Sequence, residues 1–220
     1  MILYVHDVMD KAHLQAVMDK VQADPQAFED GRKTTGWHAK TVKDNEQIKS
    51  GAADAITAMI AKTLLAHPVF KAAAIPKSFV KILVSRYRPG MSYGTHVDDA
   101  LMGGVRTDLS FTLFLKEPSD YDGGALIIEG NEGDTEVKLP AGSLVLYPTT
   151  SLHRVDPVTR GERLAIVGWI RSYVRSHEDR EMLFDLENTI AALREAKADR
   201  AIMDRLFKVR TNLIRKWADD

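Results

Sequence analysis

The feature that most constrains the fold is a series of six short apolar segments between residues 79 and 170. Clusters of Gly, Pro, Asp or Asn bound them, and no helical pattern lies between them, which argues against a parallel βαβ sheet. The spacing predicts an α+β protein whose core is an antiparallel double-sheet barrel of the jelly-roll type, a double-stranded β-helix. The segments are FVKILVSRY, LSFTLFL, ALIIEG, TEVKL, SLVLYP and RLAIVGWI.

The N-terminal region, residues 1–77, is predicted to be mainly helical and to pack on this barrel. Apolar residues recur at helical spacing in residues 10–23 and again in residues 45–66, where His67-Pro68 ends the pattern. Between these two helices, residues 36–42 predict a short strand.

The C-terminal region, residues 176–220, predicts a helical extension of the barrel domain at residues 78–175. Two apolar stripes at helical spacing indicate a hairpin that packs on the barrel or on a second subunit, so a homodimer through these helices is one expectation. The stripes are Leu186, Ile190 and Leu193, then Ile202, Leu206, Val209 and Leu213.

Composition excludes several classes of site and partner. The chain has 30 basic and 31 acidic residues and a net charge of −1, so neither nucleic acid nor an anionic membrane is expected as a partner. A secretory signal and an apolar run of bilayer-spanning length are not apparent, which predicts a cytoplasmic protein. Because the chain has no cysteine, a metal would be held by His, Asp or Glu.

A candidate metal site lies in the segment THVDD. Residues two apart in a strand point to the same side, so His96 and Asp98 could present an imidazole and a carboxylate to one ion. His153, which follows the segment SLVLYP, is a candidate third ligand. Two His and one carboxylate on one face of a metal leave the opposite positions free, as non-haem Fe(II) oxygenases require.

The His-x-Asp spacing alone is a weak signal. His177 and Asp179 repeat it in a charged stretch that leads into a helix, where the two side chains diverge, so that copy is interpreted as surface. Arg163 adds a second signal, because it is the first residue of an apolar strand. Burial of a cation costs free energy unless an anion binds it. A guanidinium can bind a carboxylate through two parallel hydrogen bonds, although a strand-edge ion pair with Glu162 or a nearby Asp would also account for Arg163.

Together these residues resemble a known family. The run YRPGMSYGTHVD at residues 87–98, followed by Gly123-Gly124, His153 and Arg163, resembles the prolyl/lysyl-hydroxylase-like branch of the Fe(II)/2-oxoglutarate dioxygenases. Over nearly its full length the chain looks like the bacterial PKHD-type hydroxylases, which have a similar length and helical terminal regions.

The resemblance implies an Fe(II)- and 2-oxoglutarate-dependent dioxygenase that hydroxylates a C–H bond of an unidentified small molecule or peptide, using O₂. It makes His96, Asp98 and His153 the iron ligands, Arg163 the partner of the distal carboxylate of 2-oxoglutarate, and Tyr87 a contact of the same cosubstrate. It also implies ascorbate as a reductant and a link to iron homeostasis. Collagen-type prolyl hydroxylases generally have Lys where this chain has Arg163, which weakens an inference that the substrate is proline.

Two further residues are candidates for the wall of the pocket. Trp169 shares a strand face with Arg163 by alternation, and Tyr93 lies in the ligand segment, although packing in the core explains either residue. Two other functions remain open. The same site could serve a regulatory protein that senses iron or 2-oxoglutarate with little turnover, or a cupin-like metalloenzyme that uses another divalent metal.

Overall fold

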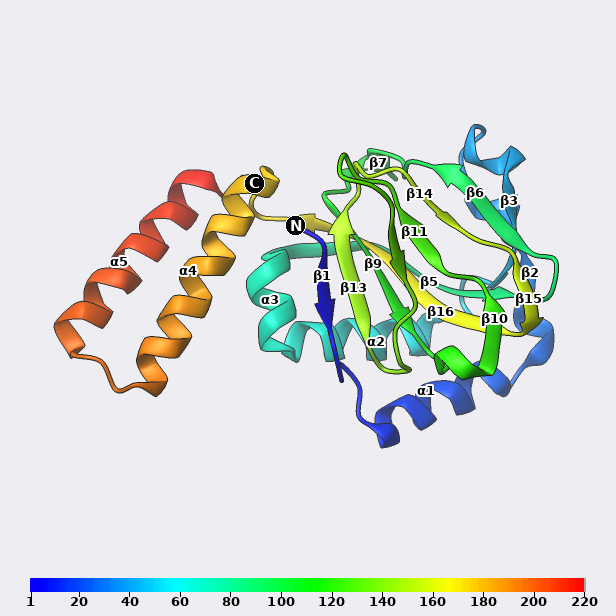
Figure 1. The fold of residues 1–220 in the computed structure, drawn as a ribbon, viewed down its shortest axis with the longest axis horizontal. Helices are drawn as coiled ribbons and strands as arrows, with labels where there is room; N and C mark the ends of the chain where they lie inside the picture. Colours follow the sequence, from blue (N-terminus) through cyan, green and yellow to red (C-terminus); the bar gives the residue numbers. More distant parts are fainter. Residues whose placement is uncertain (220) are drawn as a thin grey trace.

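Two antiparallel sheets form the body of the molecule (Figure 1). The computed structural model describes residues 1–219. In spatial order the larger sheet contains β1 (Leu3–Val5), β13 (Leu144–Pro148), β9 (Leu109–Phe114), β16 (Arg163–Ser172), β5 (Pro76–Tyr87), β4 (Glu46–Ile48) and β2 (Phe28–Asp30). The smaller sheet contains β12 (Thr135–Val137), β11 (Leu126–Ile128), β14 (His153–Val155), β6 (Ser92–His96) and β3 (Lys43–Asp44).

Two ribbons and a set of helices complete the described chain. The ribbons are β10 (Tyr121–Gly123) with β15 (Val158–Gly161), and β7 (Leu101–Met102) with β8 (Val105–Arg106). The α-helices are α1 (Lys11–Gln22), α2 (Asp54–Ala66), α3 (Pro68–Ala74), α4 (His177–Glu195) and α5 (Arg200–Trp217). Short 3-10 helices span Pro25–Ala27, Gly31–Thr34, Ala39–Thr41 and Pro118–Asp120. None of the helices in residues 1–219 is both long and apolar enough to cross a bilayer.

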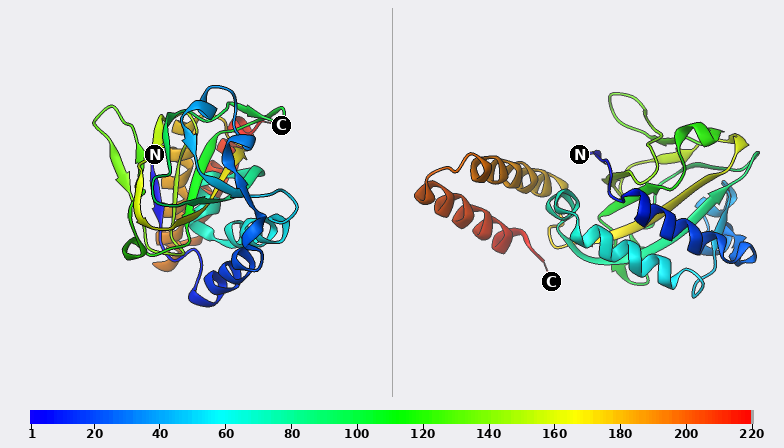
Figure 2. Two further views of the ribbon diagram at one scale, coloured as in Figure 1. Left: turned by 90° about the vertical axis from the view of Figure 1, so that its right-hand side faces the viewer. Right: turned by 90° about the horizontal axis from the view of Figure 1, so that it is seen from below.

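The six predicted apolar segments are all strands, and each belongs to one of the two sheets. The longest pairing joins β5 and β16, with Tyr87 opposite Arg163 at one end and Lys81 opposite Trp169 toward the other. One buried apolar cluster lies between the two sheets, and a larger one lies between the larger sheet and helices α1 to α3. The larger sheet is therefore covered on both faces, by helices on one and by the smaller sheet on the other (Figure 2).

The N-terminal region differs from the prediction in two places. Residues 36–42 contain a 3-10 turn and no strand, and the helix expected from residue 45 begins at Asp54. The reason is tertiary: residues 46–48 extend the larger sheet, where Gln47 pairs with Ser85, and this pairing overrides the local helical periodicity. Strands from this region thus join both sheets and wall the site.

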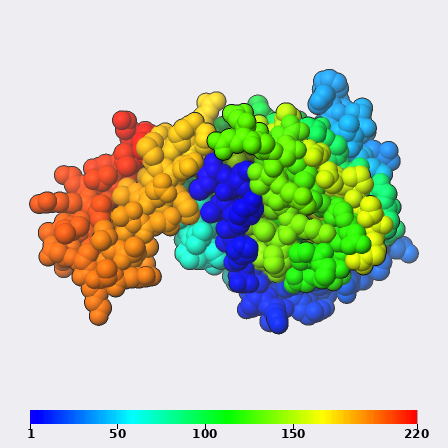
Figure 3. Space-filling model, in the orientation of Figure 1, coloured from blue at the N-terminus to red at the C-terminus, as the bar shows by residue number. Residues whose placement is uncertain are grey.

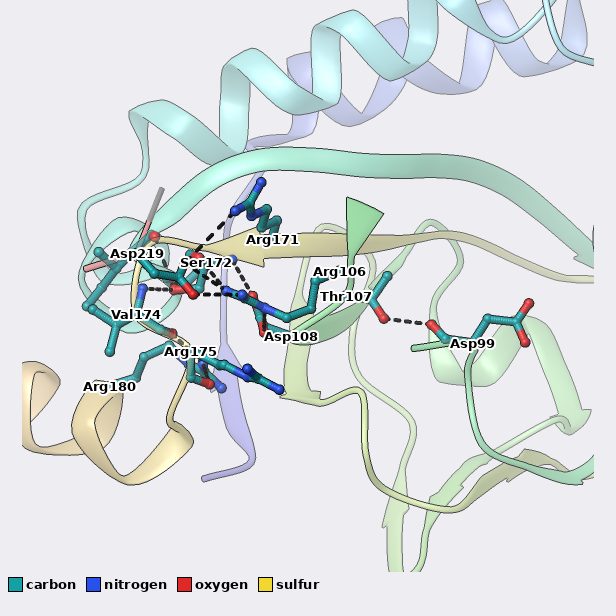
Figure 4. A network of polar contacts seen from close by, with 12 residues as sticks. Asp99, Arg106, Thr107, Asp108, Arg171, Ser172, Val174, Arg175, Arg180 and Asp219 are labelled. Atoms are coloured by element: carbon teal, nitrogen blue, oxygen red, sulfur yellow. Dashed lines mark hydrogen bonds and ion pairs between the residues drawn. The ribbon is translucent and has the colours of Figure 1, made fainter. Parts of the chain in front are cut away.

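The C-terminal helices form the predicted hairpin, which projects from the body of the molecule (Figures 1 and 3). Helix α4 packs on α3, whereas none of the residues of α5 is buried. Arg106 of β8 links Asp219, which follows α5, to the segment before β9, because its guanidinium contacts the carboxylates of Asp108 and Asp219 at 2.7 and 2.8 Å (Figure 4).

Candidate metal centre

Three side chains, from β6, β14 and the loop after β6, converge at one point. His96 ends β6 and His153 begins β14, and these two residues face each other across the antiparallel pair. Asp98 lies in the loop two residues after His96, and its two carboxylate oxygens lie 3.8 Å from His96 Nε2 and 3.7 Å from His153 Nε2. One ligand atom from each residue lies within 4.8 Å of the others. The structure therefore brings the three predicted ligands together.

Hydrogen bonds on the far side of each ligand fix its orientation. The Nδ1 atoms of His96 and His153 lie 2.8 and 3.0 Å from the carbonyl oxygens of Gly94 and Ser151, so the Nε2 lone pairs point toward Asp98. Ser110 donates from Oγ to Asp98 Oδ2 at 2.8 Å. This arrangement suits a metal, because each ligand keeps one lone pair for the ion while its other atom is held by the protein.

Burial keeps the His96 imidazole neutral. Its pKa falls to about 4, first because the ring is desolvated and then because His153 lies beside it. The ring stacks on that of Tyr93, with centroids 3.6 Å apart. A neutral imidazole is the form that binds a metal, so protons compete weakly for His96 near neutral pH.

Arg163 is buried in the cavity that contains the three ligands. The cavity has a volume of about 480 Å³ and extends between the two sheets. Arg163 is 1% exposed, and none of its three guanidinium nitrogens has a hydrogen-bond partner within residues 1–219. The guanidinium carbon lies 5.2 Å from the ring centroid of Tyr87 and 5.5 Å from that of Phe114. The alternative interpretation, an ion pair with Glu162 or a nearby Asp, is wrong, since Arg163 has no such partner within residues 1–219 and Glu162 lies near Arg86 instead.

The other predicted site residues also line this cavity. Tyr87, Tyr93 and Trp169 are among its walls, and Trp169 Nε1 is buried without an acceptor within residues 1–219. Burial raises the pKa of Tyr87 and Tyr93, so both hydroxyls keep their protons. The second His-x-Asp copy lies elsewhere: His177 is an exposed residue at the start of α4 and pairs with Glu178.

The sequence did not reveal two other residues of the cavity. Tyr147 is buried beside His153, with ring centroids 5.2 Å apart, and alternation along SLVLYP could have placed it on the inward face. Lys43 is a buried cation from β3, and no periodic pattern identifies it, because its two-residue strand is formed by pairing with β6. Lys43 Nζ lies 5.0 Å from the ring centroid of Tyr93.

The donor set fits Fe(II) and a carboxylate-bearing cosubstrate. Two imidazoles and one carboxylate match the facial set of ligands typical of non-haem Fe(II), which leaves positions for other molecules. The unpaired guanidinium of Arg163 in the same cavity fits an anion with two parallel acceptor oxygens.

Two family models match this chain. Residues 82–171 match the model described as the 2OG-Fe(II) oxygenase superfamily, and residues 178–219 match the C-terminal domain of PKHD-type hydroxylases. The first match contains all three converging ligands and Arg163, and the second covers the helical hairpin.

Solved structures with this fold include prolyl hydroxylases. A Pseudomonas putida prolyl-4-hydroxylase is 24% identical and superposes with a TM-score of 0.57 over 78% of this chain and 92% of its own. A prolyl hydroxylase from Trichoplax adhaerens is 16% identical, with a TM-score of 0.61 over 77% of this chain and 82% of its own. At these sequence identities the comparison shows that the folds are similar, and nothing more.

Curated relatives are much closer in sequence. A PKHD-type hydroxylase of Maricaulis maris is 50% identical over 94% of this chain and 99% of its own length. A PKHD-type hydroxylase of Parvibaculum lavamentivorans is 52% identical over the full length of both chains. With this identity along the whole chain, and with His96, Asp98 and His153 close enough together to hold one metal ion, the protein belongs to the PKHD-type hydroxylases and is an oxygenase of the 2OG-Fe(II) superfamily.

Proposed function

We propose that the protein couples oxidative decarboxylation of 2-oxoglutarate to hydroxylation of a C–H bond. His96, Asp98 and His153 would hold Fe(II), and Arg163 would bind the distal carboxylate of 2-oxoglutarate. The observation that carries this proposal is the buried guanidinium of Arg163, which shares the ligands' cavity and lacks a hydrogen-bond partner within residues 1–219. An unpaired buried charge is strongly unfavourable, so an anion from solution is the expected partner.

Each side chain has a distinct part in this reaction. When bound, Fe(II) supplies the activation of O₂ and the oxidation of the substrate. Ser110 holds the Asp98 carboxylate in place, and the carbonyls of Gly94 and Ser151 hold the two imidazoles. Tyr87 would contact the same cosubstrate, and the position of its ring beside the Arg163 guanidinium supports this role. The buried walls exclude water from the reacting atoms.

We further propose that the strands of residues 78–175 form a jelly roll, flanked by the regions 1–77 and 176–220. These strands supply most of both sheets, which face a common cavity, and strands β1 to β4 of the first region extend the edges of the sheets. The family resemblance supports ascorbate as a reductant, a role in iron homeostasis and a cytoplasmic location.

The exposed apolar residues of α5 support a homodimer through the hairpin, and Ile202, Phe207 and Val209 are among them.

An anaerobic titration with Fe(II) and 2-oxoglutarate tests the proposed site. We expect the visible charge-transfer band of the Fe(II)–2-oxoglutarate chelate to appear only with both components. Arg163→Met should weaken 2-oxoglutarate binding at least about tenfold, because one charge-assisted contact is worth about 1.5–3 kcal/mol. Arg163→Lys should restore part of the affinity.

Arg160 offers a matched control, because it is an exposed arginine of β15 that pairs with Asp122. Arg160→Met should leave the titration unchanged. The proposal fails if the wild-type protein gives no band, or if Arg163→Met binds 2-oxoglutarate as well as wild type. Formation of succinate on admission of O₂ then separates an enzyme from a sensor that binds both ligands without turnover.

A further inference from the structure

A buried lysine lies in the part of the cavity that the proposed cosubstrate does not use. Lys43 is 6% exposed, and its ammonium donates to Thr35 Oγ1 at 2.6 Å and to Thr34 Oγ1 at 3.3 Å. Neither partner is charged. No carboxylate of residues 1–219 lies within ion-pairing distance of this ammonium. A buried ammonium without a counter-ion is costly, which calls for an anion from outside the described chain.

A second cation lines the same cavity. Lys81 of β5 is half-buried, and it forms no ion pair within the described part of the chain. The two lysines repel each other: desolvation and then the charge of Lys81 lower the pKa of Lys43 to about 8, and the opposing charges of Asp98 and Asp30 do not offset them. Like charges that face one cavity are unfavourable unless a bound anion lies near both.

A third donor without a partner lies beside Lys81. Trp169 is opposite Lys81 in the pairing of β16 with β5, and its indole Nε1 is buried with no acceptor within residues 1–219. Two ammonium groups and one indole N–H thus supply hydrogen-bond donors to this part of the cavity. A ligand that complements these donors must be a hydrogen-bond acceptor. Because two of the donors are cations, the ligand must also be an anion.

Lys81 and Trp169 are too far from Arg163 to share its ligand. Arg163 and Trp169 are six residues apart on β16, which separates their backbones by about 20 Å. A five-carbon dicarboxylate held by Arg163 and the metal cannot extend over that distance. The lysine-rich part of the cavity therefore needs a second molecule.

We propose that Lys43, Lys81 and Trp169 bind a carboxylate of the molecule that is hydroxylated, with Lys43 as the specificity-determining residue. This inference rests on the proposed function, since it assigns the substrate class of the same site. The substrate is then an organic acid, whose carboxylate is held at this end of the cavity while a C–H bond faces the metal ligands. A neutral analogue of the same shape would leave the two lysines without a counter-ion.

Matched acid and amide probes test the inference by NMR. The protein is loaded with Zn(II) and saturating 2-oxoglutarate, then titrated separately with benzoate and benzamide. The chain has three tryptophans, so three indole N–H signals are expected, and Trp169→Phe assigns the signal of Trp169. We expect benzoate, and not benzamide, to shift that signal.

Substitutions then identify the donors. Lys43→Met should weaken benzoate binding at least about tenfold, as expected for loss of one charge-assisted contact, and Lys43→Arg should restore much of it. Lys81→Met should also weaken benzoate binding, and this variant replaces Lys43→Met as the test if Lys43→Met does not fold. Lys40 is an exposed lysine nearby in the chain that does not line the cavity, so Lys40→Met should bind as wild type does.

Three results would overturn the inference: no benzoate-specific shift in the wild-type protein, equal responses to benzoate and benzamide, or unchanged benzoate affinity in folded Lys43→Met and Lys81→Met. The anaerobic Fe(II)–2-oxoglutarate band is measured on the same proteins. A normal band without acid selectivity contradicts only the substrate class, whereas a missing wild-type band contradicts the proposed function itself.

Discussion

At the scale of the residue, the site depends on contacts that the proposed ligands make away from the metal. Asp98 is held by Ser110, which also lies 3.0 Å from the hydroxyl of Thr149. Such outer contacts orient a ligand before the metal arrives, and they affect metal affinity nearly as strongly as the ligands do.

Ser110→Ala is therefore expected to weaken metal binding by about ten- to hundredfold, because the Asp98 carboxylate loses its donor. Competition with a chelator measures the affinity for Fe(II) or Co(II). Ser78→Ala, at an exposed position of β5, is the control and should bind as tightly as the wild type. Equal affinities for wild type and Ser110→Ala would show that Asp98 needs no support.

Gly124 makes room for Arg163. Its φ is +62°, and a Cβ there would lie 2.8 Å from Val158 Cγ2 and 3.2 Å from Arg163 Cδ. Gly124→Ala should weaken 2-oxoglutarate binding as well as lower the free energy of unfolding, because it displaces the arginine. Gly104→Ala has a similar positive φ, +79°, in open space, so it should lower stability alone. Equal 2-oxoglutarate affinity in both variants, measured by the anaerobic titration, would contradict this account.

The sequence predicted which three ligands converge, but it did not predict the loop position of Asp98 or the burial of Lys43. The spacing of His96 and Asp98 led to the expectation of one strand presenting both, whereas Asp98 lies in the loop after β6. Lys43 could not be predicted, because its burial arises from strand pairing between distant segments. Burial of a charged side chain is a tertiary property that local pattern does not record.

At the scale of the element, local signals predicted the strands well where both faces are buried. The segments that became β5, β9 and β16 are long and apolar, so their pattern agrees with their place in the larger sheet. Short strands were predicted less completely: two of the six segments became the short strands β11 and β12, whereas β14 lies outside all six. β6 and β14 carry the two histidines and are short, and pairing with neighbouring strands defines them more than composition does.

Helix α3 begins with a cap that is sensitive to pH. His67 Nδ1 accepts from the amide of Phe70 at 3.4 Å, and burial lowers the pKa of His67 below the usual value of 6.5. As the pH falls, His67 is therefore protonated in the unfolded chain at a higher pH than in the folded protein. The stabilisation from the cap is complete above pH 6.5 and is lost as the pH falls through the lower pKa of the folded state.

Hydrogen exchange of the Phe70 amide measures this effect. Below the folded-state pKa of His67, we expect protection to decrease in the wild-type protein by the equivalent of about 1 kcal/mol, the usual worth of an N-cap. In His67→Asn, which has a cap that does not titrate, protection should not depend on pH in this way. The same pH dependence in both proteins would rule out the cap as its source.

At the scale of the whole molecule, the projecting hairpin is joined to the two-sheet body by polar contacts as well as by its packing on α3. Arg106 bonds to Asp108, Asp219 and the carbonyl of Ser172, and Arg180 is buried against the carbonyls of Val174 and Arg175 (Figure 4). The same network reaches the ligand segment, since Thr107 next to Arg106 donates to the carbonyl of Asp99 at 2.7 Å.

Arg106→Ala should lower the free energy of unfolding by about 2 kcal/mol, because Asp108 is buried and loses a charged partner. The substitution should also speed proteolytic cleavage between β16 and α4. Arg200→Ala is the control, since the Arg200 side chain is 94% exposed and its ion pair with Asp204 is long, at 3.8 Å. This substitution should change neither the free energy of unfolding nor the rate of cleavage. Unchanged cleavage in Arg106→Ala would mean that α3 alone holds the hairpin.

The central claim is that three side chains and one arginine, distant in sequence, form a single site for a metal and a dicarboxylate. A crystal structure of the protein with Mn(II) and 2-oxoglutarate, grown without O₂, tests it most directly. The account predicts one ion about 2.0–2.2 Å from His96, Asp98 and His153, with both nitrogens of a guanidinium fork of Arg163 on the distal carboxylate. An ion bound elsewhere, or a distal carboxylate that lies away from Arg163, would contradict it.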